Sequence, residues 1–248
     1  MKIEALDRVI QILELFSSDR PEWTVSEVSR ELDIPKTTVW EYMRDLANAG
    51  LLRRPKKTHY RLGWRAFQLG VRARSTSEIS QPARTVMLDL VEKFGQTVQL
   101  ATRYGQEVAY LEKFTPQVGI RVSVNRVGER LPAHCTAVGK VLLAHLSSSE
   151  LRSLYVNKKL IQMTNRSIGT FEELEQELAQ IHDHGYAYEM EEAIEGMACV
   201  AAPVTNEYGN AAWALSMSFL EYRFKTHSTI YKDAVVEAAE RLSHIATT

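Results

Sequence analysis

Apolar residues recur at every third or fourth position through residues 1–50, in three short runs separated by polar loops. The first run predicts a helix whose buried face is formed by Leu6, Val9, Ile10, Leu13 and Phe16. A second helix is predicted after a cap at Thr24 or Ser26, with an inward set of Val25, Val28, Leu32 and Ile34. Pro35 opens a third helix, which ends at Gly50 and buries Val39, Met43 and Leu46.

The next segment contains short apolar and basic stretches. LLRR (51–54) and HYRL (59–62) predict two brief strands joined by the turn PKKT. Three helices followed by a basic hairpin form the winged version of the helix-turn-helix, a DNA-binding module. The same elements also fit an inert subdomain or a module for protein contacts. The first two helices mix both signs of charge, whereas basic residues gather on the third helix and the hairpin. This distribution favours a DNA-binding role over a structural or protein-contact role. The basic residues are Lys36, Arg44, Arg53, Arg54, Lys56, Lys57 and Arg61.

The charge of the whole chain hides this clustering. The formal net charge is −1, yet residues 1–80 hold 14 basic and 11 acidic side chains, while residues 81–248 hold 16 and 20. The stretch 51–74 has eight Lys or Arg and no Asp or Glu. Attraction to phosphate depends on charges within about one Debye length, roughly 8 to 10 Å in physiological salt. A chain that is close to neutral is therefore compatible with nucleic-acid binding.

The pattern changes after the hairpin. A helical stretch over 64–80, ending in a Ser/Thr-rich hinge, predicts a connector in which Phe67, Leu69 and Val71 pack. Helices are then predicted over 83–95, 136–146, 171–185 and 231–246, and strands over 97–105, 107–115, 119–125, 185–190, 197–206 and 211–220. This order indicates an α+β domain with an antiparallel sheet flanked by helices. We expect a winged helix-turn-helix domain (1–63), a helical linker (64–80) and this α+β domain (81–248).

Composition adds little but excludes some classes of protein. With 45% hydrophobic and 25% charged residues, the chain resembles an ordinary globular protein. No run approaches the ~18 consecutive apolar residues of a membrane span, and MKIEALDRVI lacks the features of a signal peptide. Cys135 and Cys199 have no CxxC spacing, which fits a reducing compartment. We expect a cytoplasmic protein with no membrane partner.

Three patterns resemble catalytic or metal sites, but in each the residue types or their directions do not fit that chemistry. TAVGKVLL is not a nucleotide-binding loop, because the positions that need Gly and Ser or Thr hold His134 and Val141. Cys135 is not expected to act as a nucleophile, because neighbouring His134 points to the opposite face of a strand-like segment. His182 and His184 lie about 200° apart around a helix and cannot share one ion. We expect no enzyme activity, cofactor or metal site.

In order along the chain, six motifs resemble the IclR family of bacterial transcriptional regulators: ALDRVIQILELF, PKTTVWEYMRDLANAGLL, YRLG, RLPAHCTAVGKVLLA, GYAYEMEEAIEGMACVAAPV and WALSMS. The resemblance covers essentially the whole chain. It implies that the linking helix serves dimerisation and that the C-terminal domain is GAF-like and binds a small effector. It also implies a homodimer or homotetramer that binds double-stranded DNA at a palindromic operator, usually as a repressor.

The docking of a helix-turn-helix predicts which residues meet DNA. The N-terminal end of its second helix enters the major groove, which here presents Lys36, Thr37, Thr38, Trp40, Glu41 and Arg44. The hairpin would follow the phosphate backbone and add salt-dependent affinity through Arg53, Arg54, Lys56 and Lys57. Family members often carry Arg at the position of Glu41. A carboxylate there either alters the operator preference or pairs with a neighbouring Arg.

The resemblance also implies which residues line the effector pocket: Ile120, Ser123, Ala137, Val138, Glu189, Met197, Cys199, Ser216 and Ser218. Ser216 and Ser218 share a face because side chains alternate along a strand. The N–H groups at the start of the helix over 136–146 suit a carboxylate. Glu189 stands where the family often has a shorter Asp, which narrows the cavity or favours a ligand with donor groups. A small organic acid, a sugar acid and an aromatic acid all fit.

Two functions of different kinds remain open from the sequence. The first is a transcription factor whose operator binding responds to a small acid. The second is a small-molecule sensor whose winged helix serves protein contacts instead of DNA. Reversal of the charges on the hairpin separates them, because it weakens only the first activity.

Overall fold

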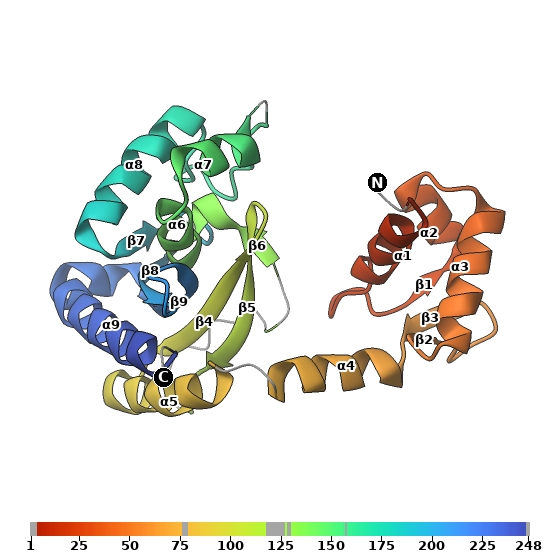
Figure 1. Ribbon diagram of the computed structural model, residues 1–248, viewed down its shortest axis with the longest axis horizontal. Helices are drawn as coiled ribbons and strands as arrows, with labels where there is room; N and C mark the ends of the chain where they lie inside the picture. Colours follow the sequence, from red (N-terminus) through yellow and green to blue (C-terminus); the bar gives the residue numbers. More distant parts are fainter. Residues whose placement is uncertain (1–3, 76–78, 118–126, 128–129, 157, 247–248) are drawn as a thin grey trace. The chain divides into compact units, whose positions relative to one another are not determined.

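In the computed structural model of the 248-residue chain, the described residues are 4–75, 79–117, 127, 130–156 and 158–246. The chain divides into two compact units, Met1–Ser77 and Glu78–Thr248 (Figure 1). Among the described residues, none of the helices is long and apolar enough to cross a membrane. Each unit has its own hydrophobic core, so the two are treated in turn.

The N-terminal unit is a winged helix-turn-helix, as the sequence predicts. Its helices are α1 (Glu4–Glu14), α2 (Val25–Leu32), α3 (Lys36–Asn48) and α4 (Trp64–Ser75). A three-stranded sheet runs in the order β1 (Trp23–Thr24), β3 (His59–Leu62) and β2 (Leu52–Arg53). Strand β1 is not predicted from the sequence; it pairs Trp23 with Tyr60 and Thr24 with His59. The core between these elements includes Ile12, Val28, Val39, Met43, Leu52 and Tyr60.

Local interactions fix the turn that presents α3. The Thr24 hydroxyl accepts the backbone N–H of Glu27, and the Glu27 carboxylate accepts the N–H of Thr24, which caps α2. Asp33 ends α2 in the left-handed region with φ 51°. The hydroxyl of Ser29 then donates to the carbonyl of Ile34 at 2.7 Å, which closes the turn before α3. The predicted inward set of α3 is confirmed, since Val39, Met43 and Leu46 are buried.

Two expectations about packing in this unit are wrong, the first in part and the second in full. On α1, Phe16 is buried and Val9 and Leu13 pack against the core as predicted, but Leu6 and Ile10 are 53% and 42% exposed and Ile12 is buried instead. On α4, Phe67, Leu69 and Val71 are 57%, 50% and 49% exposed, and no residue of this fully described helix is buried. The core of one winged helix covers only a narrow face of α1 and none of α4. Their remaining apolar side chains therefore face outward in the single chain.

The C-terminal unit is built on a six-stranded antiparallel sheet in the order β6-β5-β4-β9-β8-β7. Its strands are β4 (Thr97–Tyr104), β5 (Glu107–Phe114), β6 (Arg130–Pro132), β7 (Ala187–Met190), β8 (Met197–Thr205) and β9 (Ala211–Leu220). Its α-helices are α5 (Ser80–Phe94), α6 (Ala137–Ala144), α7 (Ser148–Tyr155), α8 (Phe171–His184) and α9 (Phe224–Ala246). The predicted α+β class is therefore confirmed. Helix α7 is not predicted, and the strand expected over 119–125 lies outside the described residues.

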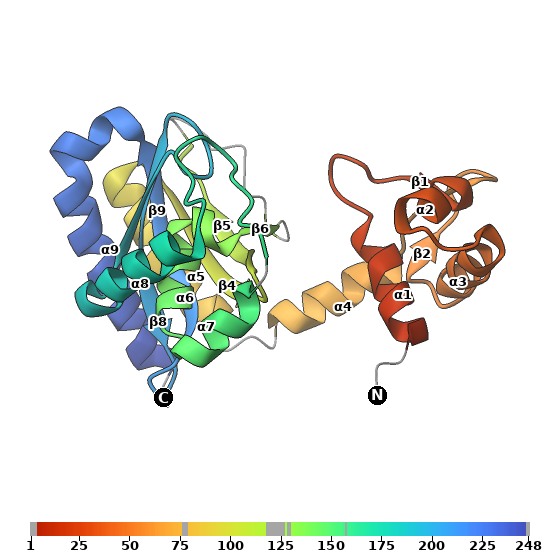
Figure 2. The same ribbon diagram turned by 90° about the horizontal axis from the view of Figure 1, so that it is seen from above.

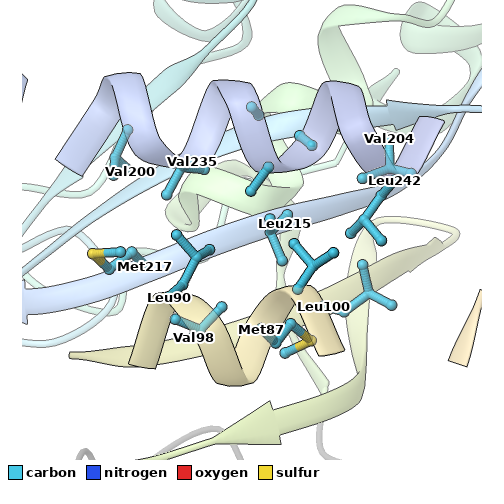
Figure 3. Packing of buried hydrophobic residues seen from close by; sticks show 14 of the residues in the cluster. Met87, Leu90, Val98, Leu100, Val200, Val204, Leu215, Met217, Val235 and Leu242 are labelled. Atoms are coloured by element: carbon cyan, nitrogen blue, oxygen red, sulfur yellow. The ribbon is translucent and has the colours of Figure 1, made fainter. Parts of the chain in front are cut away.

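The two faces of this sheet carry different side chains. Helices α5 and α9 cover one face (Figures 1 and 2), and large apolar residues fill the space between them, as Figure 3 shows. Val98 and Leu100 of β4 and Leu215 and Met217 of β9 belong to this layer. Helices α6 and α8 cover the other face. Because side chains alternate along each strand, that second face receives smaller and more polar residues, including Gln99, Cys199, Ser216 and Ser218.

Candidate functional site

Helix α3 presents one polar face away from the core of its unit. Lys36, Thr37, Trp40, Glu41 and Arg44 are exposed and Thr38 is half-buried. The Arg44 guanidinium lies 4.8 Å from the centre of the Trp40 ring and pairs with Asp45 at 2.9 Å. Among the residues that the structure describes, Glu41 forms no ion pair within 4.0 Å, but after Asp45 its charge also helps to raise the pKa of Arg44, so the predicted interaction with a neighbouring Arg is present only as a longer-range attraction. The Glu41 carboxylate is left on the face expected to meet DNA.

The hairpin carries the second predicted set. Arg53, Arg54, Lys56 and Lys57 are all exposed. The Arg54 guanidinium donates to the carbonyl of Lys57 and lies 5.1 Å from the centre of the Tyr60 ring, which fixes the shape of the turn. Arg61 pairs with Glu22 at 3.2 Å, so its charge is largely balanced within the unit. The wing therefore offers a basic surface at the tip of the hairpin.

A pocket lies between the polar face of the sheet and the start of α6. Its walls come from β4, β5, α6, the end of β7, the β7–β8 loop, β8 and β9: Gln99, Tyr110, Thr136, Ala137, Val138, Glu189, Ala193, Ile194, Met197, Cys199, Ser216 and Ser218. Seven of the nine predicted effector residues are among them. The other two, Ile120 and Ser123, lie outside the described residues.

A polar network crosses the floor of the pocket. The hydroxyls of Ser216 and Ser218 donate to Oε1 of Gln99 at 3.5 and 3.2 Å, and the thiol of Cys199 lies 3.2 Å from the Ser218 hydroxyl. The Nε2 group of Gln99 is buried and has no hydrogen-bond partner among the described residues. Because buried polar groups are normally paired, this amide is a donor suited to a ligand. Gln99 is missed by the sequence analysis because only strand pairing brings β4 beside β9.

Glu189 provides a carboxyl group on the pocket wall. Its Oε1 accepts the backbone N–H groups of Glu192 at 2.6 Å and Ala193 at 3.1 Å. Burial raises the pKa of Glu189 to about 7, although these hydrogen bonds favour the charged form. The carboxyl group therefore exchanges its proton near neutral pH. It also holds the β7–β8 loop, which includes Ala193 and Ile194, against the pocket.

The start of α6 closes the pocket on another side. The Thr136 hydroxyl caps the helix by accepting the N–H of Gly139 at 3.0 Å. A Cβ on Gly139 would lie 2.1 Å from the carbonyl oxygen of Ala133, so only glycine fits this close approach. Ala137 and Val138 occupy the first turn, where amide N–H groups lack partners within a helix. This end of α6 is therefore suited to an anion.

Lys140, one turn further along α6, is fully buried behind the pocket. Its Nζ contacts Oε1 of Glu177 on α8 at 2.5 Å and Oε1 of Glu192 in the β7–β8 loop at 2.6 Å. Burial favours the neutral amine, but Glu192 and Glu177 raise the pKa of Lys140 above its usual value. This cluster is not predicted from the sequence. Its signal was a single lysine within the otherwise apolar helix AVGKVLLA.

The free space in the pocket is small. It measures about 20 Å³, on a scale where one water needs roughly 10–15 Å³. A ligand larger than water therefore requires side chains or the β7–β8 loop to move outward. The loop is held by the Glu189 carboxyl and by the Lys140–Glu192 pair, so an outward movement of the loop would have to break these contacts.

The structure corrects one detail of the catalytic patterns. Residues Ala133–Cys135 form a 3-10 turn instead of a strand-like segment. The Nε2 atom of His134 and the thiol of Cys135 consequently approach the same carbonyl, that of Ile161, at 3.0 and 3.4 Å. Burial raises the pKa of Cys135, so the sulfur keeps its proton and is not activated as a nucleophile.

His182 and His184, which the sequence predicts cannot share one ion, lie on α8 and contact different groups. His182 contacts the carbonyl of Ala144 at 3.0 Å, and His184 stacks on Tyr186. Across the part of the chain that the structure describes, no group of three His, Cys, Asp or Glu side chains is placed to hold a metal ion.

Comparison with known proteins agrees with this architecture. Residues 5–56 match the model of the IclR helix-turn-helix domain, and residues 71–244 match the model of the C-terminal part of the bacterial transcriptional regulator IclR. The HTH-type transcriptional regulator XynR of Escherichia coli (strain K12) is 33% identical over 222 residues, which cover 89% of this chain and 88% of XynR.

Solved structures share the fold over nearly the whole chain. An IclR transcriptional regulator from Alicyclobacillus acidocaldarius aligns with a TM-score of 0.86 at 24% identity, covering 99% of this chain and 100% of that one. The repressor BlcR of Agobacterium tumefaciens aligns with a TM-score of 0.62 at 27% identity, covering 99% and 98%. The chain therefore belongs to the IclR family and is a DNA-binding transcriptional regulator with a C-terminal effector-binding domain.

Proposed function

We propose that this regulator is a homo-oligomeric repressor that acts in the cytoplasm on a palindromic operator and responds to a small organic acid. The acid binds in the pocket at the start of α6 and changes the affinity of the protein for DNA. The proposal rests on three groups that line one pocket. They are the unpaired amide of Gln99, the titratable carboxyl of Glu189 and the helix N-terminus at Ala137. The name of BlcR as a repressor supports the sign of regulation.

The surface of the winged helix supports direct binding to duplex DNA. The exposed face of α3 supplies Lys36, Thr37 and Trp40 for the major groove, with Thr38, Glu41 and Arg44 beside them. The wing supplies Arg53, Arg54, Lys56 and Lys57 for the phosphates. Glu41 accepts a hydrogen bond from cytosine N4 more readily than it approaches a phosphate, so it contributes to the choice of operator.

Exposed apolar side chains support association of two copies. Leu6 and Ile10 on α1 and Phe67, Leu69 and Val71 on α4 are large, apolar and exposed in the single chain. A contiguous exposed apolar surface indicates an interaction site, and Phe67 and Val71 lie one turn apart on the same face of α4. A homodimer buries them and places two α3 helices to read the two halves of a palindrome.

The chemistry of the pocket favours a hydroxylated carboxylic acid. Its carboxylate meets the N–H groups of the first turn of α6, at Ala137 and Val138, and the amide of Gln99. A ligand hydroxyl meets Ser216 or Ser218, and the protonated Glu189 carboxyl donates to an oxygen of the ligand. Sugar acids and aromatic hydroxy acids share this pattern, and the movement of the β7–β8 loop sets the size that is admitted.

A thermal-shift screen of organic, sugar and aromatic acids tests the effector proposal. An acid present at 100 times its dissociation constant stabilises the folded chain by roughly 2.7 kcal/mol. The same acid should bind at least tenfold more weakly to Gln99→Leu, measured by titration calorimetry. If every hit binds Gln99→Leu as well as the natural chain, the proposed pocket is wrong.

Charge reversal in the wing tests the DNA proposal. Arg53→Glu with Arg54→Glu should weaken binding to all duplexes and lower the slope of log affinity against log salt by about four, because a homodimer carries four of these arginines. Lys93→Glu with Lys225→Glu makes the same change of charge on exposed residues of the C-terminal unit and should leave both values unchanged. Equal DNA affinity of the wing variant and the natural chain, measured by fluorescence anisotropy, would favour a protein-contact role for the winged helix.

A further inference from the structure

A second cavity lies in the C-terminal unit, where the β4–β5 turn meets β6, the end of α7 and the segment 159–161. Its volume is about 260 Å³, against about 20 Å³ for the effector pocket on the same scale. We call it the hairpin cavity, and its described walls are Tyr104, Gly105, Gln106, Glu107, Pro132, His134, Tyr155, Lys159, Leu160 and Ile161. The described walls of the two cavities share no residue.

Two buried polar atoms in its wall lack partners. The Nδ1 atom of His134 and the hydroxyl of Tyr155 form no hydrogen bond with any residue that the structure describes, and both residues are only 3% exposed. Their rings meet edge to face, with centroids 6.2 Å apart. Buried groups of this kind are normally satisfied, so two of them in one wall indicate a missing polar partner.

The hydrogen-bonding role of each atom follows from its surroundings. The carbonyl of Ile161, 3.0 Å from Nε2 of His134, can only accept, so Nε2 carries the proton of the neutral ring and Nδ1 is an acceptor. Burial lowers the pKa of His134, which keeps the ring neutral. Burial likewise raises the pKa of Tyr155, which keeps its hydroxyl as a donor. A ligand hydroxyl that reaches both atoms meets both needs, because it donates to Nδ1 and accepts from the Tyr155 hydroxyl. The wall must shift to expose the two atoms, since neither is open to water in this structure.

The rest of the wall selects a flat anion. The rings of Tyr104, His134 and Tyr155 offer aromatic surface, and Leu160 and Ile161 add apolar surface. Lys159 is exposed at the rim and supplies positive charge. The acidic wall residue Glu107 lies 3.7 Å from Arg130, which offsets its negative charge. A carboxylate near Lys159 is therefore favoured over a cation.

From these contacts we propose that the hairpin cavity is a second small-molecule site, which binds a hydroxylated aromatic acid with its hydroxyl between His134 and Tyr155 and its carboxylate near Lys159. The site is separate from the effector pocket and does not depend on the function proposed for that pocket. Ordered water between His134 and Tyr155 is the competing occupant, because a water also donates to one atom and accepts from the other.

Titration calorimetry on the full-length chain tests the proposal with two matched probes, 3-hydroxybenzoate and benzoate. The hydroxylated probe should bind the natural chain about tenfold more tightly than benzoate does. Tyr155→Phe removes one of the two partners of the ligand hydroxyl and should reduce this difference, while Lys159→Gln should weaken both probes. Tyr222→Phe, which changes an exposed tyrosine elsewhere in the unit, is the control and should bind like the natural chain.

Variants of the effector pocket separate the two sites. Ser218→Leu fills that pocket and should leave binding of 3-hydroxybenzoate to the hairpin cavity unchanged. The proposal is overturned if neither probe binds at millimolar concentration, or if binding is lost in Ser218→Leu and kept in both Tyr155→Phe and Lys159→Gln. A crystal grown with 3-hydroxybenzoate that holds only water between His134 and Tyr155 also overturns it. Unfolding temperatures of the variants confirm that each one is folded.

Discussion

Lys140 is the residue at which three parts of the C-terminal unit meet. It lies on α6, and its ammonium group contacts Glu177 of α8 and Glu192 of the β7–β8 loop. Because the N–H of Glu192 also binds the Glu189 carboxyl, one chain of contacts runs from the pocket to α8. This cluster holds the loop that must move when the pocket admits a ligand.

Removal of the lysine charge should destabilise the unit. Lys140→Met leaves the Glu192 carboxylate buried without its cation, so we expect the free energy of unfolding to fall by about 3 kcal/mol in urea denaturation. Adding Glu192→Leu to Lys140→Met should restore most of that loss. Lys93→Met, at an exposed position, serves as the control. A loss below about 1 kcal/mol in Lys140→Met would contradict this role.

The proton on Glu189 should make effector binding depend on pH. Burial raises the pKa of this group from 4.5 to about 7, so the folded chain holds the proton between these values and the unfolded chain does not. The contribution of Glu189 to stability therefore falls as pH rises from 4.5 to 7. Above pH 7 its negative charge repels an acid, so affinity should fall up to tenfold per pH unit.

Glu189→Gln should remove the pH dependence that Glu189 gives to stability and to acid affinity. Calorimetric affinities for the acid, measured from pH 6 to 8.5, should decline in the natural chain and stay nearly level in this variant. If the two proteins show the same decline, the titration belongs to another group.

At the scale of elements, the sequence predicts what local patterns determine. Periodicity locates α3, α5 and the four long or central strands, and the alternation along β9 places Ser216 and Ser218 on one face. Features that depend on contacts between distant segments cannot be predicted from the sequence pattern. Gln99 enters the pocket because β4 pairs with β9, and Lys140 is buried because α8 and the β7–β8 loop cover it.

For helices α1 and α4, the sequence predicts the helix but not the burial of its apolar side chains. Their apolar patterns correctly predict helices, yet Leu6, Ile10 and Phe67 remain exposed, because amphipathic periodicity does not say whether the partner surface belongs to the same chain. The family resemblance implies that the linking helix serves dimerisation, and in the proposed homodimer a second copy would cover Phe67.

Charge placed on α4 should therefore weaken association. Phe67→Lys with Leu69→Lys should shift the protein toward a monomer in analytical ultracentrifugation, because the added ammonium groups would have to be desolvated at an interface. Gln68→Lys, an exposed polar position on the same helix, should keep the mass of the natural protein. Equal masses for all three proteins would place the interface elsewhere.

At the scale of the whole molecule, DNA binding and effector binding belong to different units. The N-terminal unit carries the basic wing and α3, and the C-terminal unit carries both cavities. Under the proposed function, an acid alters DNA binding only if its affinity differs between two states of the protein. Opening of the β7–β8 loop is the local change that we expect to distinguish those states.

The most direct test is the affinity of the full-length protein for an operator selected from genomic fragments, measured by fluorescence anisotropy with and without the acid found in the screen. We expect the acid to weaken operator binding at least tenfold in the natural chain. Gln99→Leu should bind the operator equally well without the acid and respond little to the same concentration. An equal response in Gln99→Leu, or a natural chain that prefers no fragment over random DNA, would contradict control of DNA binding from this pocket.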